Sequence, residues 1–372
     1  MKLEKFFKNK TGDLAFLEPK SEIENTMLRN RLSAPIPLWS ESLVEGIKEG
    51  EFEEEVGSVH IIEGMIAVIG IDPLFKFANT YIEILSEMME NPLETILSFA
   101  WKYDKDGDKV KAAIAYRAAL TFDDYNDIAM SNLASIYGEI ANESEDAQLI
   151  NELIIEGTDL LEDVLNRYKS DEVRPLLGKY YINAGLYLKA KLTMEPYLQV
   201  GEKEEVKQEV RELLDFIEPE VICETIESQL TQGKLDIAEE NILQALIKYP
   251  KMHRISFLYS VLLWASGKEK ESETELLNII ESYPYAHYYN QLLIQKYLLM
   301  QYEEGLKIAD EALSNNENEP TIMGNRAMFL NALGRTEEAL INVNYAINLS
   351  ESPELTNQLK ELRREIAENA EV

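Results

Sequence analysis

A motif that returns after 34 residues constrains this chain more than any other feature. Its elements are a glycine, a small residue five places later, an apolar residue seven places after that, and a proline. The two clearest copies are Gly233, Ala238, Ala245 and Pro250, and then Gly267, Ser272, Ile279 and Pro284. A period of 34 residues is typical of paired helices that stack into a solenoid, and solenoids offer extended binding surfaces.

The small residue marks further copies along the chain. It recurs at Ala112, Gly157, Ala190, Ala238, Ser272, Gly305 and Ala339. We expect it to lie where helices A and B of one repeat cross closely, because only a side chain without bulk fits there. The pattern therefore predicts seven copies, and Ala78, which lies 34 residues before Ala112, indicates a degenerate eighth.

On these residues the chain resembles the tetratricopeptide repeat family. The segment Asn325 to Ile347, NRAMFLNALGRTEEALINVNYAI, reads like the family's turn and start of helix B, and LLGKYYINAGLYLKAKLTMEPYL from Leu176 fits as well. The resemblance implies an all-α, right-handed α-α superhelix with about seven to eight helical hairpins. The copies start near Leu93, Asp127, Asp171, Pro219, His253, Ala286 and Pro320.

Four regions follow from this register. We expect an N-terminal helical extension over 1–58, a degenerate helical hairpin over 59–92, the repeat solenoid over 93–353 and a charged capping helix over 354–372. Extra residues near Asn142 to Leu149 predict a loop or an added helix, and Glu205 to Ile217 predicts a separate extra helix before Pro219.

The first 90 residues carry weaker signals. The segment Val59 to Gly70 is apolar nearly all round, which predicts a buried helix. Asp72 and Pro73 predict an N-cap and first turn for the next helix. Upstream, 33–39 reads as a turn-rich linker before a helix over 40–50. Four lysines in 1–10 around two phenylalanines leave two alternatives, a basic docking tail or a terminus that packs back.

Charge excludes one class of partner. The formal net charge is -32, from 36 basic and 68 acidic residues. Nucleic acids are bound by neutralising phosphates with Lys and Arg, so binding to nucleic acid is not expected. The same field favours basic partners, although an acidic surface also serves solubility, and both explanations remain open.

Nothing in the sequence indicates a membrane span or an oxidising compartment. The longest apolar run, Met65 to Ile71, is far shorter than the roughly 20 residues that cross a bilayer. No signal-peptide pattern follows the lysines of 1–10. The single cysteine, Cys223, permits no internal disulfide. We therefore expect a cytoplasmic protein, and the oligomeric state stays open.

Motifs for catalysis, metal ions and cofactors were sought without success. Asp104, Asp106 and Asp108 mimic half of a calcium loop, but Lys109 occupies the position that needs glycine. The three histidines show no paired metal-binding spacing, and neither a phosphate-binding loop nor a nucleophile elbow occurs. The sequence predicts no enzyme, no metal and no cofactor.

The resemblance implies that function lies on the concave face, which helix A lines at positions 2, 5, 9 and 12 of each repeat. The family's lysine, asparagine and arginine clamp for a terminal carboxylate is absent, and core packing remains the alternative for each aromatic residue. The candidate partner-binding residues are Leu97, Trp101, Lys179, Glu220, Glu227, Arg254, Phe257, Val261, His287, Asn290, Ile294 and Met328.

These observations favour a non-enzymatic scaffold or adaptor that holds a protein or peptide segment in the concave face. The alternative is a peptide-responsive regulator that acts through its N-terminal region by protein contact, and an enzyme with its site in the first 90 residues is a third. The expected ligand is extended or helical, with apolar anchors and a net positive charge.

Overall fold

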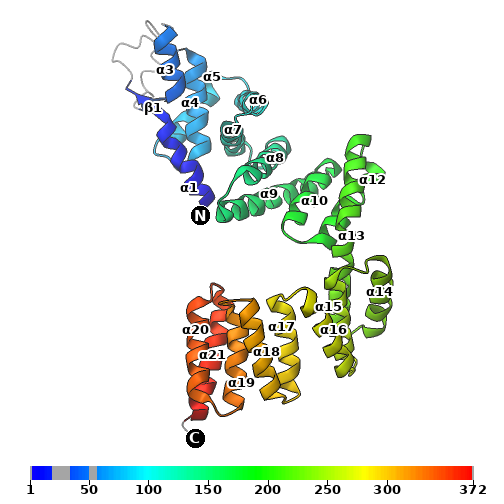
Figure 1. The fold of residues 1–372 in the computed structure, drawn as a ribbon. Coiled ribbons are helices and arrows are strands. Elements are labelled where there is room, and N and C mark those ends of the chain that lie inside the picture. Colours follow the sequence, from blue (N-terminus) through cyan, green and yellow to red (C-terminus); the bar gives the residue numbers. More distant parts are fainter. Residues whose placement is uncertain (1, 19–33, 50–56, 371–372) are drawn as a thin grey trace. The chain divides into compact units, whose positions relative to one another are not determined.

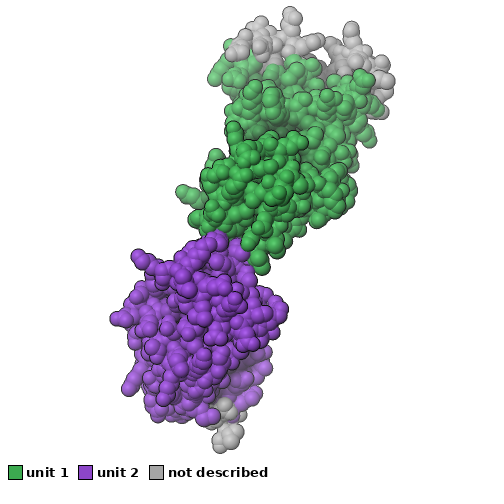
Figure 2. Space-filling view, turned by 90° about the vertical axis from the view of Figure 1, so that its right-hand side faces the viewer, with its two compact units in different colours: residues 1–217 green, residues 218–372 purple. Residues whose placement is uncertain are grey.

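The structure, a computed structural model, describes residues 2–18, 34–49 and 57–370 (Figure 1). The chain forms two compact units, Met1–Ile217 and Glu218–Val372 (Figure 2). The boundary between them lies inside a helix, at a position where the sequence predicted no division.

Unit 1 begins with a short mixed segment. Helix α1 (Lys2–Asn9) and the 3-10 helix η1 (Lys10–Asp13) lead into strand β1 (Leu14–Leu17), which pairs antiparallel with β2 (Ile36–Trp39). The expectation of a turn-rich linker over 33–39 was therefore wrong for residues 36–39. Helices α3 (Ser40–Glu49), α4 (Ser58–Ile71) and α5 (Ala78–Met88) follow.

Helix α4 is buried over Glu63–Ile71, as its apolar sequence predicted. Helix α5 begins later than expected, at Ala78 rather than just after Pro73. The rings of Phe75 and Phe77 explain the delay, because they pack 6.1 Å apart and Phe75 stacks on Phe16 at 5.7 Å. These contacts hold residues 73–77 in a turn.

Paired helices make up the rest of unit 1. The pairs are α6 (Pro92–Lys105) with α7 (Lys109–Phe122), α8 (Asp127–Glu143) with α9 (Ala147–Tyr168), and α10 (Arg174–Asn183) with α11 (Tyr187–Met194), accompanied by the short helices η2 (Asp171–Val173) and α12 (Tyr197–Val200). Asn91, Asp108 and Asn126 cap α6, α7 and α8 through their side chains. The extra residues near 142–149 mostly lengthen α8 and α9, and residues 144–146 form a short loop between them rather than an added helix.

Unit 2 continues the pairs. They are α14 (Leu235–Lys248) after the end of α13 (Glu204–Thr231), α15 (His253–Ala265) with α16 (Glu269–Ser282), α17 (Ala286–Leu298) with α18 (Tyr302–Asn315), and α19 (Pro320–Ala332) with α20 (Thr336–Leu349), closed by α21 (Pro353–Ala370). Pro219 lies inside α13 and does not end it. The predicted separate helix over 205–217 was therefore wrong, since it is continuous with the following helix A.

The turns between helices A and B explain the recurring glycine. Gly267 has a φ of 73°, a left-handed conformation that glycine adopts without steric cost. In the sixth copy Met300 stands at this place with a φ of 56°, so that turn keeps its shape without glycine. Apart from β1 and β2, the described residues form the expected all-α fold of paired helices (Figure 1).

All seven small residues of the repeat are buried. At two of them the close neighbour belongs to helix A of the next copy. A Cβ on Gly157 of α9 would lie 2.5 Å from the Tyr180 ring of α10, and a Cβ on Gly305 of α18 would lie 2.2 Å from the Phe329 ring of α19. The expected crossing within one repeat is seen at Ser272, whose hydroxyl donates to the Ser260 carbonyl of helix A in the same copy at 2.7 Å. At Gly157 and Gly305 the position also admits an aromatic ring of the following copy.

Candidate functional site

The candidate residues fall in both units. Leu97, Trp101 and Lys179 belong to unit 1, and the other nine belong to unit 2. The two units are therefore treated as separate candidate surfaces.

In unit 2, seven candidate residues lie on the A helices of three successive copies, and Arg254, the seventh, is described separately below. We call Phe257, Val261, His287, Asn290, Ile294 and Met328, from α15, α17 and α19, the A-helix face. Ile294 is 40% exposed, and the other apolar members are half-buried. Such side chains can add apolar contact area to a ligand without leaving the core they help to build.

Contacts between neighbouring A helices connect this face. The Phe257 ring of α15 meets the His287 ring of α17 edge-on at 5.9 Å. Farther along, Asn325 Nδ2 of α19 donates a hydrogen bond to Asn290 Oδ1 of α17 at 2.6 Å. Members of successive copies are thereby held in one surface.

Arg254 is not a free cation. Its guanidinium pairs with Glu220 and donates hydrogen bonds to Glu227 Oε1 from Nη2 at 2.8 Å and from Nε at 3.2 Å. Burial lowers the pKa of Arg254, yet the hydrogen bond and charge of Glu227 and the charge of Glu220 outweigh burial and leave this pKa raised. The two carboxylates around one guanidinium leave an excess of one negative charge beside the A-helix face.

Sequence reasoning missed a cluster of aromatic and imidazole rings at the same place. We call His253, Phe257, Tyr283, Tyr285, His287 and Tyr288 the ring cluster. The centroids of neighbouring rings in it lie 3.9–6.1 Å apart. Tyr288 is buried at its centre and hydrogen-bonds to His253 Nδ1, whereas Tyr285 is 47% exposed. The signal was visible as YPYAHYY over 283–289, which spans the start of helix A in the sixth copy.

The candidates in unit 1 are arranged differently. Trp101 is 60% exposed, and Lys105 Nζ lies 5.0 Å from the centre of its ring. Leu97 packs against the unit 1 core, and Lys179 Nζ pairs with Glu209 at 2.5 Å. Only Trp101 therefore presents substantial apolar area, and a lysine of the chain already occupies part of it.

The basic N-terminal segment packs back onto unit 1. Leu3 is 2% and Phe7 0% exposed, and the Arg117 guanidinium lies 4.3 Å from the centre of the Phe7 ring. The Leu3 amide donates to Glu152 Oε2 at 2.7 Å, and Lys8 pairs with Asp72 at 3.5 Å. Two alternatives were open for this segment, a basic docking tail or a terminus that packs back, and α1 packs back onto unit 1.

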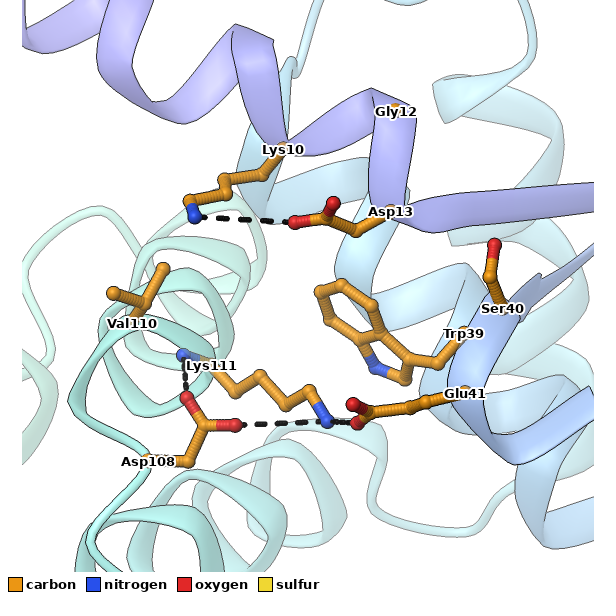
Figure 3. A pocket seen from close by; sticks show the side chains of 9 residues that line it. All are labelled: Lys10, Gly12, Asp13, Trp39, Ser40, Glu41, Asp108, Val110 and Lys111. Carbon is orange, nitrogen blue, oxygen red and sulfur yellow. Dashed lines mark hydrogen bonds and ion pairs between the residues drawn. The ribbon is translucent and has the colours of Figure 1, made fainter. Parts of the chain in front are cut away.

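Figure 3 shows a pocket of about 460 Å³ in unit 1, which the sequence did not predict. Trp39 forms one wall, and Lys111 Nζ lies 4.8 Å from the centre of its ring. Lys111 pairs with Glu41 and with Asp108 at 3.5 Å, while Lys10 pairs with Asp13 at 3.9 Å. The charged groups that line this pocket thus pair with one another.

No helix in the described part of the chain combines the length and the apolar character needed to cross a membrane. Cys223 is fully buried, and burial raises the pKa of its thiol to about 12. This thiol is therefore protonated at neutral pH and unsuited to nucleophilic chemistry.

A family model supports the presence of the repeat in part of the chain. The family model of the tetratricopeptide repeat matches residues 224–287, from the end of α13 to the start of α17. The search of curated proteins returned no match.

Among solved structures, a thermophilic tetratricopeptide repeat protein of Thermus thermophilus is similar at 19% identity and a TM-score of 0.37, over 52% of this chain and 98% of that one. PilF of Pseudomonas aeruginosa is similar at 16% identity and a TM-score of 0.36, over 55% and 90%. The TPR2AB domain of yeast Sti1, in a complex with pHSP90, is similar at 13% identity and a TM-score of 0.29, over 74% and 98%.

Proposed function

We propose that this tetratricopeptide repeat protein is a non-enzymatic adaptor that holds a protein segment on the A-helix face of unit 2. The segment carries apolar anchors and a net positive charge. One observation carries the proposal: three successive A helices present half-buried apolar and aromatic side chains, in a chain of net charge -32.

The apolar members supply affinity. Buried aromatic anchors dominate the binding energy of many interfaces. Phe257 is already held by its ring contacts with His287 and with Tyr288 at 5.0 Å, so it loses little freedom when a ligand covers it.

Charge selects the ligand. An acidic segment would meet a repulsive field, and Arg254, which lies beside the face, is already bound by Glu220 and Glu227. A basic segment is attracted over a distance, which raises its association rate more than its final affinity. We therefore assign the acidic surface a role in the choice of partner.

Trp101 remains a separate candidate contact in unit 1. A ligand that uses it must displace or accommodate Lys105, whose ammonium lies over the indole. We place the main site in unit 2 for this reason. The cytoplasmic location and the division into extension, hairpin, solenoid and cap stay proposals of the same kind.

A selection of random 12-residue peptides against the immobilised full chain tests the function. Selected peptides should be net positive and enriched in Phe, Leu or Trp, and Phe257→Ala should lower their affinity by about tenfold or more. The matched control is Ile341→Ala, since Ile341 is also an exposed apolar residue of unit 2, 69% accessible, but lies on a B helix. This control should bind like the unmodified protein.

Two outcomes would contradict the proposal. One is a selection dominated by acidic peptides. The other is a set of binders whose affinity is unchanged in Phe257→Ala, because the A-helix face would then supply no anchor; a loss of affinity in Trp101→Ala alone would place the site in unit 1 instead.

A further inference from the structure

We propose that the ring cluster is a subsite for a positively charged side chain, arginine in preference to lysine, of the segment held on the A-helix face. The inference deepens the proposed function and rests on it. It goes beyond a general preference for basic ligands, because it assigns the charge to a particular place.

The first argument is the accessible edge of the cluster. Tyr285 and His287 lie at the start of α17, with nearly parallel rings at an interplanar angle of 20° and centroids 5.9 Å apart. Tyr285 is 47% exposed, and His287 is exposed beside it. Tyr288 is buried and packs against both rings, with centroid distances of 5.9 Å to Tyr285 and 3.9 Å to His287. The two outer rings are therefore held in place by a buried ring.

The second argument is that in the described part of the chain no cation lies over a ring of the cluster, although Arg254, which is paired with Glu220 and Glu227, is close enough for its charge to act on Tyr288 and His287. Elsewhere the chain places lysine or arginine over its aromatic rings, as with Lys105 over Trp101, Lys248 over Tyr249 and Arg167 over Tyr125. Within residues 2–18, 34–49 and 57–370, no lysine or arginine stands over a ring of the cluster. Ring faces are electron-rich and attract cations, most strongly a planar guanidinium that can stack.

The third argument is the charge around the cluster. The groups whose charge acts on Tyr288 are Tyr285, Arg254 on α15, and Cys223 and Glu220 on α13. Glu227 shares Arg254 with Glu220, and the charge of Glu224 also acts on Cys223. The thiol is neutral, and the two carboxylates leave one negative charge beyond the guanidinium they bind. An incoming cation therefore gains from the surroundings as well as from the rings.

The protonation state of His287 should affect whether the cluster binds a cation. His253 contacts Tyr283 at 4.3 Å, and His287 contacts Phe257 and Tyr288. Burial, followed by the charges of His253 and Arg254, lowers the pKa of His287, so this imidazole is neutral at neutral pH. Protonation in acid places a positive charge inside the cluster, and the subsite should then reject a cationic side chain.

The test uses a small probe with a neutral twin. The full chain, labelled with ¹³C at the histidine Cε1, is titrated with N-acetyl-arginine amide and separately with N-acetyl-citrulline amide, which has nearly the same shape without the charge. The chain has three histidines, and His60 in unit 1 is an internal reference. Single His→Gln variants assign the resonances.

At about pH 7.5 the arginine amide should shift the His253 and His287 signals in a saturable way and leave His60 unchanged, with citrulline amide at least about threefold weaker. At an acidic pH where the ¹³C signal of His287 itself shows that its ring is protonated, the difference between the two probes should disappear. Tyr285→Leu should weaken arginine amide binding, whereas Tyr345→Leu, on the 52% exposed Tyr345 of α20, should not.

Equal shifts from both probes, equal shifts at His60, or the absence of a saturable shift would each overturn the subsite. Failure here is distinct from failure of the proposed function. Selected peptides that depend on Phe257 but tolerate replacement of every arginine by citrulline would leave the adaptor role intact and remove only the subsite.

Discussion

Replacing Gly305 by alanine probes the packing that defines the repeat. A Cβ at this position would lie 2.2, 2.4 and 2.8 Å from three atoms of the Phe329 ring, where ordinary contacts lie at 3.4–4 Å. All three atoms belong to one ring, so the ring must move as a body. Phe329 is 1% exposed, and the Tyr297 ring packs edge-on against it at 5.7 Å, which leaves little room for movement.

The expected cost follows from two opposing effects. Overpacking a filled core costs about 1–3 kcal/mol. Alanine in a helix is favoured over glycine by about 1 kcal/mol, which offsets part of that cost. We expect Gly305→Ala to lower the free energy of unfolding of unit 2 by about 1–2 kcal/mol.

Urea denaturation followed by circular dichroism measures the change, and hydrogen exchange of α18 and α19 shows whether it is local. The same substitution in a Phe329→Leu background is the decisive comparison. Without the ring, the added methyl fills space and keeps its helical advantage, so the effect should reverse and become stabilising. Destabilisation of equal size in both backgrounds, or stabilisation by Gly305→Ala alone, would refute the assignment of the ring to this position.

Two further predictions concern stability. Ala339 is fully buried at the same repeat position, so Ala339→Arg should lower the free energy of unfolding by several kcal/mol. Ile341→Arg, at a 69% exposed residue of the same helix, should change the free energy of unfolding little. An unchanged melting temperature for Ala339→Arg would show that the register is wrong. In unit 1, hydrogen bonds from Lys189 and Tyr181 lower the pKa of Glu162 from its usual 4.5, so the stabilisation is present above that pH and is lost as the pH falls through the folded value. Melting temperatures across the acid range should therefore fall less steeply in Glu162→Gln than in the unmodified protein, and parallel curves would contradict the assignment.

The pairing of helices could be predicted because the small residue recurs in all seven copies. The turn glycine accompanies it in most copies and the helix-ending proline only at Pro250 and Pro284, and Met300 shows that the turn also forms without glycine. The β1–β2 pair could not be predicted in this way, because residues 36–39 pair with residues 14–17, which are distant in the sequence, and no local sequence pattern indicates this pairing. Pro219 led to the wrong prediction of a helix end, because proline usually ends a helix but α13 continues through it.

The candidate residues of α15 were chosen from the repeat register alone, without knowledge of their side-chain partners. The repeat register located Arg254 and Phe257, but not the pairing of Arg254 with Glu220 or the hydrogen bond between His253 and Tyr288. Both pairs were nevertheless readable, since their members are 34 and 35 residues apart and occupy nearly equivalent places in successive copies. Comparing each helix A position with its equivalent in the next copy would have revealed them.

The kinetics of one selected peptide test the central claim most directly. Stopped-flow association and dissociation are measured at about 50 and 500 mM salt, over which the Debye length shrinks about threefold. The account predicts that the association rate falls with salt to the same extent in the unmodified protein and in Phe257→Ala, and that Phe257→Ala accelerates dissociation. An association rate that is independent of salt would contradict the electrostatic choice of partner. An unchanged dissociation rate in Phe257→Ala would contradict the assignment of the binding site to the A-helix face.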